Sequence, residues 1–184
     1  MTQEAVAARF REINGDHPMS AEDDAYVSRQ FRVLTELCAE HGRDVDDVRG
    51  LMLAGKLPMP GYLRSDGAEM VPADLFALAD RVGLDELHDW FVAQWQDVAD
   101  GKDEWEAYLS GQYVCLHSVT PATIQRKDQL IKAIDAGPDP AELKLLVDEL
   151  DELEPGFTGY DRLRFNGPVS RDTHISALRA RLAE

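Results

Sequence analysis

The chain has 184 residues and a formal net charge of −16, because 35 acidic side chains outnumber 19 basic ones. Hydrophobic residues make up 44% of the sequence and charged residues 29%, a balance that supports a folded core and excludes disorder of the whole chain. No stretch approaches about 18 uncharged apolar residues and the first fifteen residues lack a secretory pattern, so we expect no membrane contact and a cytoplasmic location.

The first third of the sequence is typical of short helices. Apolar residues at helical spacing predict helices over residues 2–14, 20–42 and 44–55. Ser20 and Asp44 precede the second and third of these, and both residue types are favoured N-caps. We therefore expect both helices to begin with a side-chain cap.

Residues 57–71 have a different pattern. Pro58 and Pro60 exclude a helix, and Ser65, Asp66 and Gly67 form a tight-turn signal between two short apolar segments. This stretch predicts a β-hairpin.

The remaining sequence returns to helices. Pro72 is expected to open one that ends at Gly83, and the next two are predicted over residues 85–99 and 103–109. The apolar run 113–119 fits a strand or a helix.

Three further helices are predicted beyond this run. Thr120 and Pro121 begin one that ends at Gly137, and Asp139 and Pro140 begin another that carries an apolar stripe. Residues 156–168 are expected to form a loop. Ser170 is expected to cap the last helix, which continues to Leu182.

Together these elements predict a mainly α, compact multi-helix single domain with one β-hairpin. No long or low-complexity linker divides residues 1–184. We expect an N-terminal lobe over about residues 20–82 and a helical C-terminal lobe over about residues 85–184.

The segment DVDDVRGLMLAGKLPMPGYLRSDGAEMVPADLFAL, residues 44–78, resembles the winged helices of the excisionase type and the mercury-regulator type. The resemblance implies a reading helix that ends near Gly55 and a wing tip at Asp66. The reading helix would present Asp46 and Asp47 beside a single Arg49. The two carboxylates would repel phosphate at the contact surface. A winged helix reused as a scaffold is favoured over a DNA reader, and a transcriptional regulator stays open as an alternative.

A second resemblance covers most of the chain. GYLRSDGAEMVPADLFAL, WEAYLSGQYVCL, TPATIQRK and YDRLRFNGPVSRDTHI are similar to an uncharacterised family of small proteins encoded in actinomycete natural-product gene clusters. The resemblance implies a role in or beside secondary metabolism and assigns no catalytic residue.

Charge is distributed unevenly along the chain. Residues 73–111 carry ten acidic and two basic side chains, whereas residues 161–184 carry five arginines and three acidic side chains. The overall negative field opposes nonspecific nucleic-acid binding. The arginines either pair with the acidic middle of the same chain or form an anion-binding site.

Candidate catalytic residues come from two pairings. Cys115 and His117 would project to one side of an extended strand, which would allow a thiol and an imidazole to meet. Lys127 and Tyr113 would serve as acid and base only if burial shifted their pKa values toward neutrality. Either pairing would make the protein an enzyme acting on an amino-acid-like substrate, and the sequence leaves open whether it is one.

The leading hypothesis is binding. Aromatic and cationic side chains in the segments of the second resemblance suit a pocket for a small anionic metabolite, and a biosynthetic enzyme is the alternative partner. Ordinary packing with surface ion pairs explains the same residues. The candidate ligand-binding residues are Trp105, Tyr108, Tyr160, Arg162, Arg164 and Arg171.

No metal ion or cofactor is predicted. Cys38 with His41, and Cys115 with His117, supply zinc-type ligands, but their spacing matches no zinc knuckle. Asp85 and His88 share a helix face without the partner motif of a di-metal centre. The oligomeric state is left open.

Overall fold

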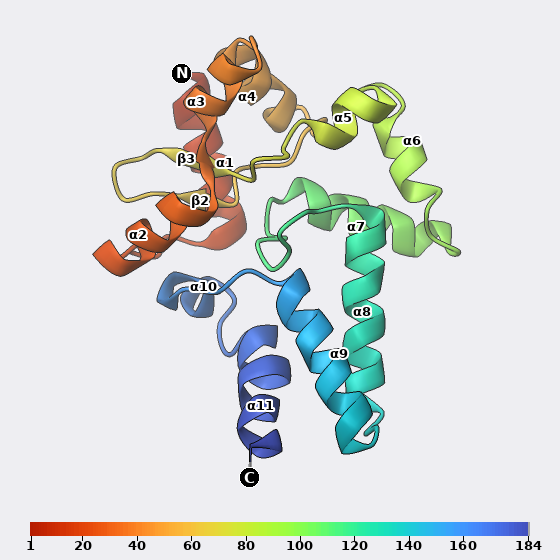
Figure 1. Cartoon of the computed structure of the whole chain (residues 1–184). Coiled ribbons are helices and arrows are strands. Elements are labelled where there is room, and N and C mark those ends of the chain that lie inside the picture. Colours follow the sequence, from red (N-terminus) through yellow and green to blue (C-terminus); the bar gives the residue numbers. More distant parts are fainter. Residues whose placement is uncertain (184) are drawn as a thin grey trace. The chain divides into compact units, whose positions relative to one another are not determined.

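The computed structural model describes residues 1–183, and helices dominate this range (Figure 1). The predicted mainly α fold is confirmed, with a small three-stranded antiparallel sheet as its β component. None of the helices described is long and apolar enough to cross a membrane. The chain divides into two compact units, Met1–Val114 and Cys115–Glu184. The single domain and its lobes stay predictions.

The first unit contains seven helices and the three strands within its described residues. The predicted caps Ser20 and Asp44 are confirmed: Ser20 accepts from the Asp23 amide, and Asp44 accepts from the amides of Asp46 and Asp47. Its elements are α1 (Thr2–Asn14), α2 (Ala21–Gln30), β1 (Arg32–Val33), α3 (Leu34–Glu40), α4 (Val45–Leu53), β2 (Tyr62–Leu63), β3 (Glu69–Val71), α5 (Ala77–Val82), α6 (Leu87–Val92) and α7 (Val98–Leu109).

The predicted continuous helix over residues 20–42 is wrong. At Phe31 the backbone becomes extended, with φ −124° and ψ 166°, and strand β1 separates α2 from α3. Arg32 pairs with Val71 and Val33 pairs with Met70. Pairing with a strand almost forty residues away therefore overrides the local helical pattern.

The predicted β-hairpin is confirmed. Strands β2 and β3 pair antiparallel, with Tyr62 opposite Met70 and Leu63 opposite Glu69, and Gly67 in the turn adopts φ +84°. The sheet order is β1-β3-β2, so β3 is central. From α2 to β3, the chain order is thus helix, strand, two helices and a two-stranded hairpin.

Arg49 of α4 is buried beneath the hairpin. Its guanidinium donates to both carboxylate oxygens of Glu69 on β3, with Nη2 2.7 Å from Oε2, and to Asp46 at 2.9 Å. Only 8% of the Arg49 side chain and 2% of the Glu69 side chain are exposed. The pair joins α4 to the central strand, and α1 also packs on α4.

The boundaries predicted around residues 85–109 are wrong. Helix α6 ends at Val92, and α7 begins at Val98, where Asp97 accepts a hydrogen bond from the Ala99 amide. Gly101 lies inside α7, and a Cβ at this position would lie 2.6 Å from the Val92 carbonyl oxygen. A glycine that resembles a helix breaker in the sequence instead allows close packing of α7 on α6.

The second unit is helical throughout its described elements. Helices α8 and α9 lie side by side, joined by a short turn at Gly137, and α11 packs against α9 (Figure 1). The predicted caps Thr120 and Asp139, each followed by proline, are confirmed. The elements are α8 (Pro121–Asp135), α9 (Pro140–Leu153), α10 (Gly159–Arg164), the π-helical segment η1 (Arg171–Ser176) and α11 (Ala177–Leu182). Helices α8 and α9 and segment η1 share a core of Leu130, Ile134, Val147, Leu150 and Ile175.

Two predictions for the end of the chain are wrong. Residues 156–168 contain helix α10, because Thr158 and Asp161 form a capping box at its start. Ser170 does not cap the last helix; its hydroxyl donates to Glu154 instead, at 2.5 Å. The helical region that follows begins with π geometry, a form often found at functional sites.

Candidate functional site

The candidate residues named from the sequence fall in both units. Trp105, Tyr108 and Tyr113 belong to the first unit. The others, Cys115, His117, Lys127, Tyr160, Arg162, Arg164 and Arg171, belong to the second. The predicted pairing of Lys127 with Tyr113 would join residues of different units.

The aromatic candidates of the first unit pack in its core. Trp105 and Tyr108, both on α7, are 5% exposed, and each ring lies 5.1–5.3 Å from the Phe91 ring of α6. Burial, with a contribution from Asp74, raises the pKa of the Tyr108 phenol above its usual value. Ordinary core packing explains both side chains.

Tyr113 and His117 flank Cys115 in a stretch that is neither strand nor helix. The Tyr113 hydroxyl donates to Glu104. The His117 side chain is exposed, and its backbone amide donates to the Leu153 carbonyl at 3.2 Å. The extended geometry that would place Cys115 and His117 on the same side is therefore not present.

Lys127 is the candidate whose surroundings are richest in chemistry. It lies on α8, its side chain is 13% exposed, and its ammonium is 2.7 Å from Oε1 of the fully buried Glu154. It also donates to the Ser170 hydroxyl at 3.1 Å and to the Cys115 sulfur. We call these four side chains, Cys115, Lys127, Glu154 and Ser170, the Lys127 centre.

The charges in the Lys127 centre determine its protonation. Burial alone lowers the pKa of Lys127, but Cys115 and Glu154 outweigh it, so this pKa lies above its usual value. Burial raises the pKa of the Cys115 thiol, and Lys127 offsets only part of the increase. At neutral pH the centre therefore holds an ammonium and a thiol, rather than a neutral amine or a thiolate.

Glu154 is held in place from its backbone. It follows the last residue of α9, where helix carbonyl groups lack partners within the helix. Arg171 donates to the Glu154 carbonyl at 2.7 Å and to the Pro155 carbonyl at 3.1 Å, and its Nη1 is 2.6 Å from Asp151. Arg171 therefore anchors the start of η1 to the end of α9, which brings Ser170 to Glu154.

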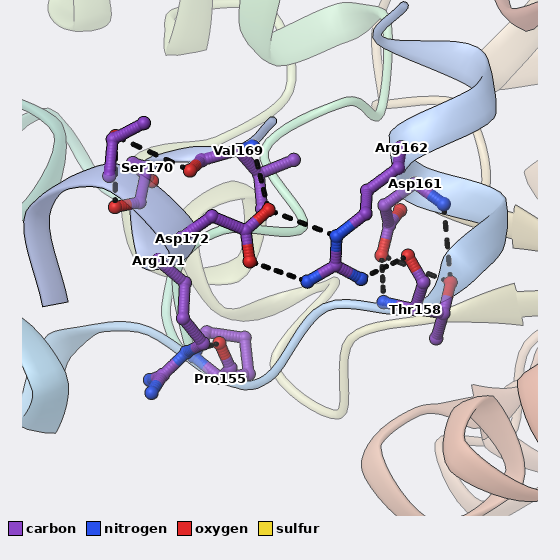
Figure 2. A network of polar contacts seen from close by, with 9 residues as sticks. Pro155, Thr158, Asp161, Arg162, Val169, Ser170, Arg171 and Asp172 are labelled. Atoms are coloured by element: carbon purple, nitrogen blue, oxygen red, sulfur yellow. Dashed lines mark hydrogen bonds and ion pairs between the residues drawn. The ribbon is translucent and has the colours of Figure 1, made fainter. Parts of the chain in front are cut away.

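The other two arginines predicted to bind a ligand are also paired with carboxylates. Figure 2 shows the Arg162 guanidinium facing Asp172, with contacts of 2.9 and 2.6 Å, and it also donates to the Thr158 carbonyl. Arg164 contacts Asp161 at 2.8 Å and lies over the buried Tyr160 ring, 5.2 Å from its centroid. Asp172, Asp161 and Asp151 of the second unit thus pair with the three candidate arginines, whereas one alternative from the sequence placed their partners in the acidic middle, residues 73–111. A ligand role for these arginines stays a prediction.

Glu154 was not among the site residues predicted from the sequence, and Ser170 was expected to have a different role. A signal for Glu154 was present, because it continues the buried face of α9 formed by Val147 and Leu150 at helical spacing. A glutamate at such a position requires a buried partner. Its partner could not be read from the sequence, since Lys127 lies on another helix.

Metal ligands do not gather in the part of the chain that the structure describes. Within residues 1–183 no three His, Cys, Asp or Glu side chains are placed to hold a metal ion. Cys38 is buried in the first unit and Cys115 lies in the second, and both are free cysteines.

The fold and the Lys127 centre define a mainly α-helical protein with a buried polar centre in its second unit. The model of a family of unknown function, DUF6058, matches residues 85–183, more than half of the chain, and the chain belongs to this family. Neither the curated proteins nor the solved structures include a match to it. The matched range contains every residue of the Lys127 centre.

Proposed function

We propose that the protein is a cytoplasmic small-molecule-binding protein of natural-product biosynthesis, and that the Lys127 centre holds its ligand without chemically changing it. The observation that carries this proposal is a buried ion pair, Lys127 with Glu154, that two further polar side chains contact. Ser170 bonds to both members of the pair, and Cys115 accepts a hydrogen bond from Lys127. Burying such a group is costly unless its polar atoms are satisfied, which favours a specific role for it.

The protonation of the Lys127 centre favours binding over catalysis. A serine or cysteine nucleophile needs a neighbouring base, and a lysine acts as that base only when it is neutral. The raised pKa of Lys127 keeps it charged, and the raised pKa of Cys115 keeps it protonated. Cys115 is therefore a weak nucleophile at neutral pH.

The natural-product context rests on the resemblance of the sequence to proteins of actinomycete gene clusters. Membership in a family of unknown function is compatible with that context. A biosynthetic enzyme remains the alternative partner, and co-purification from a producing cell tests it.

A thermal-unfolding screen of the full chain against a library of metabolites tests the proposal. A ligand at 100 times its Kd adds about 2.7 kcal/mol of stability, which should raise Tm by roughly 5–10 °C for a protein of this size. The shift should shrink in Ser170→Ala and persist in the matched control Ser176→Ala, which lies outside the centre. Mass spectrometry should recover the ligand unchanged.

Two results would contradict the proposal. If every ligand gives the same Tm shift in Ser170→Ala as in the wild type, the ligands bind outside the centre and the proposal fails. A product that forms with the wild type and not with Ser170→Ala would make the protein an enzyme.

A transcriptional regulator is the second candidate, and the element order of residues 21–71 favours it. Helix α2, strand β1, helices α3 and α4 and the β2–β3 hairpin follow one another in the order of a winged helix, with β3 between the other two strands. Helix α4 would be the reading helix, and the hairpin would be the wing.

The charges of this segment oppose that candidate. The first unit carries 23 acidic and ten basic side chains. Arg49 forms a buried ion pair with Glu69, and Arg64 of the hairpin pairs with Asp66 at 2.7 Å. Asp46 and Asp47 are exposed on α4. Phosphate contacts need cations at this surface, so duplex DNA should be repelled.

Gel retardation at low salt distinguishes the two candidates. The binding proposal expects no retardation of duplex DNA at 50 mM salt. A regulator requires retardation that weakens with added salt and in Lys56→Ala, whose exposed ammonium lies just beyond α4, but not in the control Lys144→Ala of the second unit.

A further inference from the structure

The hydrogen bonds of the Lys127 centre are distributed unequally between the two oxygens of Glu154. Oε1 accepts from Lys127 at 2.7 Å and from the Ser170 hydroxyl at 2.5 Å. Oε2 is buried and has no hydrogen-bond partner among the described residues. One carboxylate oxygen is therefore doubly satisfied and the other is unsatisfied.

The donors of the centre are already used. A lysine ammonium has three N–H groups, and those of Lys127 point to Glu154, Ser170 and Cys115. The single hydroxyl hydrogen of Ser170 goes to Glu154. Neither side chain can turn a donor to Oε2 without releasing a partner it already holds.

An unsatisfied buried carboxylate oxygen is costly, because it has lost its hydration without gaining a hydrogen bond. The group that completes the centre must therefore bring its own N–H or O–H. We infer that the Lys127 centre binds an uncharged small molecule bearing a hydroxyl or amide N–H, which donates to Glu154 Oε2. This inference rests on the proposed function and names the class of its ligand.

Charge excludes the other two classes of small ligand. An anion would meet a bare carboxylate oxygen with no free donor beside it, inside a chain of net charge −16. A cation would place a second positive charge near the Lys127 ammonium, in surroundings where unpaired charges are poorly solvated. A neutral donor satisfies Oε2 and adds no charge.

Three residues of the centre have intermediate exposure. Lys127, Ser170 and Cys115 are partly exposed, whereas Glu154 is closed. A small molecule that contacts these three side chains lies next to Glu154. A trapped water molecule is the competing occupant, since water also donates a hydrogen bond.

The test uses three probes of matched size and different charge: glycolamide, ethanolamine and glycolate. Each is titrated into the ¹⁵N-labelled full chain, and the backbone amide signals of Cys115, Lys127, Glu154 and Ser170 are followed. Glycolamide should shift these signals with saturation, and glycolate should leave them unchanged up to 100 times the protein concentration. The exposed carboxylate partner Glu149 provides the control signal.

The variant Glu154→Gln reverses the expected preference. Its side-chain amide replaces the acceptor Oε2 with an N–H₂ donor while keeping the shape, and it leaves the Lys127 charge unbalanced. Glycolamide binding should weaken about tenfold or more, and glycolate binding should appear. Glu149→Gln, a surface change on helix α9, should alter neither.

The outcomes separate this inference from the proposed function. Glycolate or ethanolamine preferred over glycolamide in the wild type would overturn the ligand class and leave binding at the centre intact. No probe-dependent shift at the centre, with a bound water at Oε2 in a crystal structure, would overturn the inference. The proposed function would then fail only if the metabolite library also gave no ligand sensitive to Ser170→Ala.

Discussion

Replacing Lys127 with methionine should reveal how strongly the second unit depends on its buried ion pair. The substitution keeps most of the side-chain length and removes the ammonium, so Glu154 retains only the Ser170 hydroxyl as a donor. Removing one partner of a buried pair typically costs about 3–5 kcal/mol, because the other charge remains buried and unpaired. With Lys127 13% exposed and Glu154 0% exposed, this range applies here.

The same pair of helices supplies a matched control. Arg126, next to Lys127 on α8, makes two contacts of 2.6 Å with Glu149 of α9, but both side chains are more than 40% exposed. Water screens this pair, so Arg126→Met should cost less than about 1 kcal/mol. The two substitutions affect neighbouring residues whose ion pairs differ in burial, so the difference between their costs measures the effect of burial.

Native-state hydrogen exchange of the α8 and α9 amides is the appropriate assay, because it measures the opening free energy of the second unit directly. All three tryptophans lie in the first unit, so their fluorescence would report the wrong part of the chain. The double variant Lys127→Met/Glu154→Leu should recover most of the loss. Equal losses for Lys127→Met and Arg126→Met would refute the buried, charged description of the centre.

Three further predictions test other parts of the structure. Arg64 lowers the pKa of Asp66 to about 2, so this carboxylate should stay ionised down to that pH by NMR, and Arg64→Gln should return its pKa toward the usual value of about 3.9. In a Cys38→Ala background, the raised pKa of Cys115 should make its alkylation rate keep increasing above pH 9; a plateau below pH 8.5 would contradict the burial of the thiol. Gly111→Ala would place a Cβ 2.3 Å from the Met59 carbonyl oxygen and should cost at least about 3 kcal/mol in urea unfolding, whereas Gly42→Ala, which has a similar φ and open space, should cost about 1 kcal/mol.

Local signals were sufficient for much of the fold. Ser20, Asp44, Thr120 and Asp139 each cap the helix expected of them, because an N-cap depends on residues within one turn. The hairpin was found for the same reason, since its turn residues are adjacent in the sequence. Strand β1 was missed because two residues become a strand only through pairing with β3.

The candidate site was only partly accessible to sequence reasoning. Lys127 and Cys115 were named from the sequence, but Glu154, the partner of Lys127, was not. The bond from Lys127 to Ser170 spans 43 residues, and no local pattern indicates it. Ser170 has the residue type of an N-cap, and only the tertiary position of Glu154 shows that its hydroxyl is used elsewhere.

The range of the family match separates the Lys127 centre from the β2–β3 hairpin. Of the net charge of −16, the first unit carries −13, and residues 73–111 alone account for −8, so most of this negative charge follows the β2–β3 hairpin in the sequence. The family match begins at residue 85, beyond that hairpin, and includes the whole Lys127 centre. A function encoded by the matched range therefore has no need of the β2–β3 hairpin or α4. It does have available the second unit, of net charge −3, in which one buried carboxylate oxygen has no hydrogen-bond partner among the described residues.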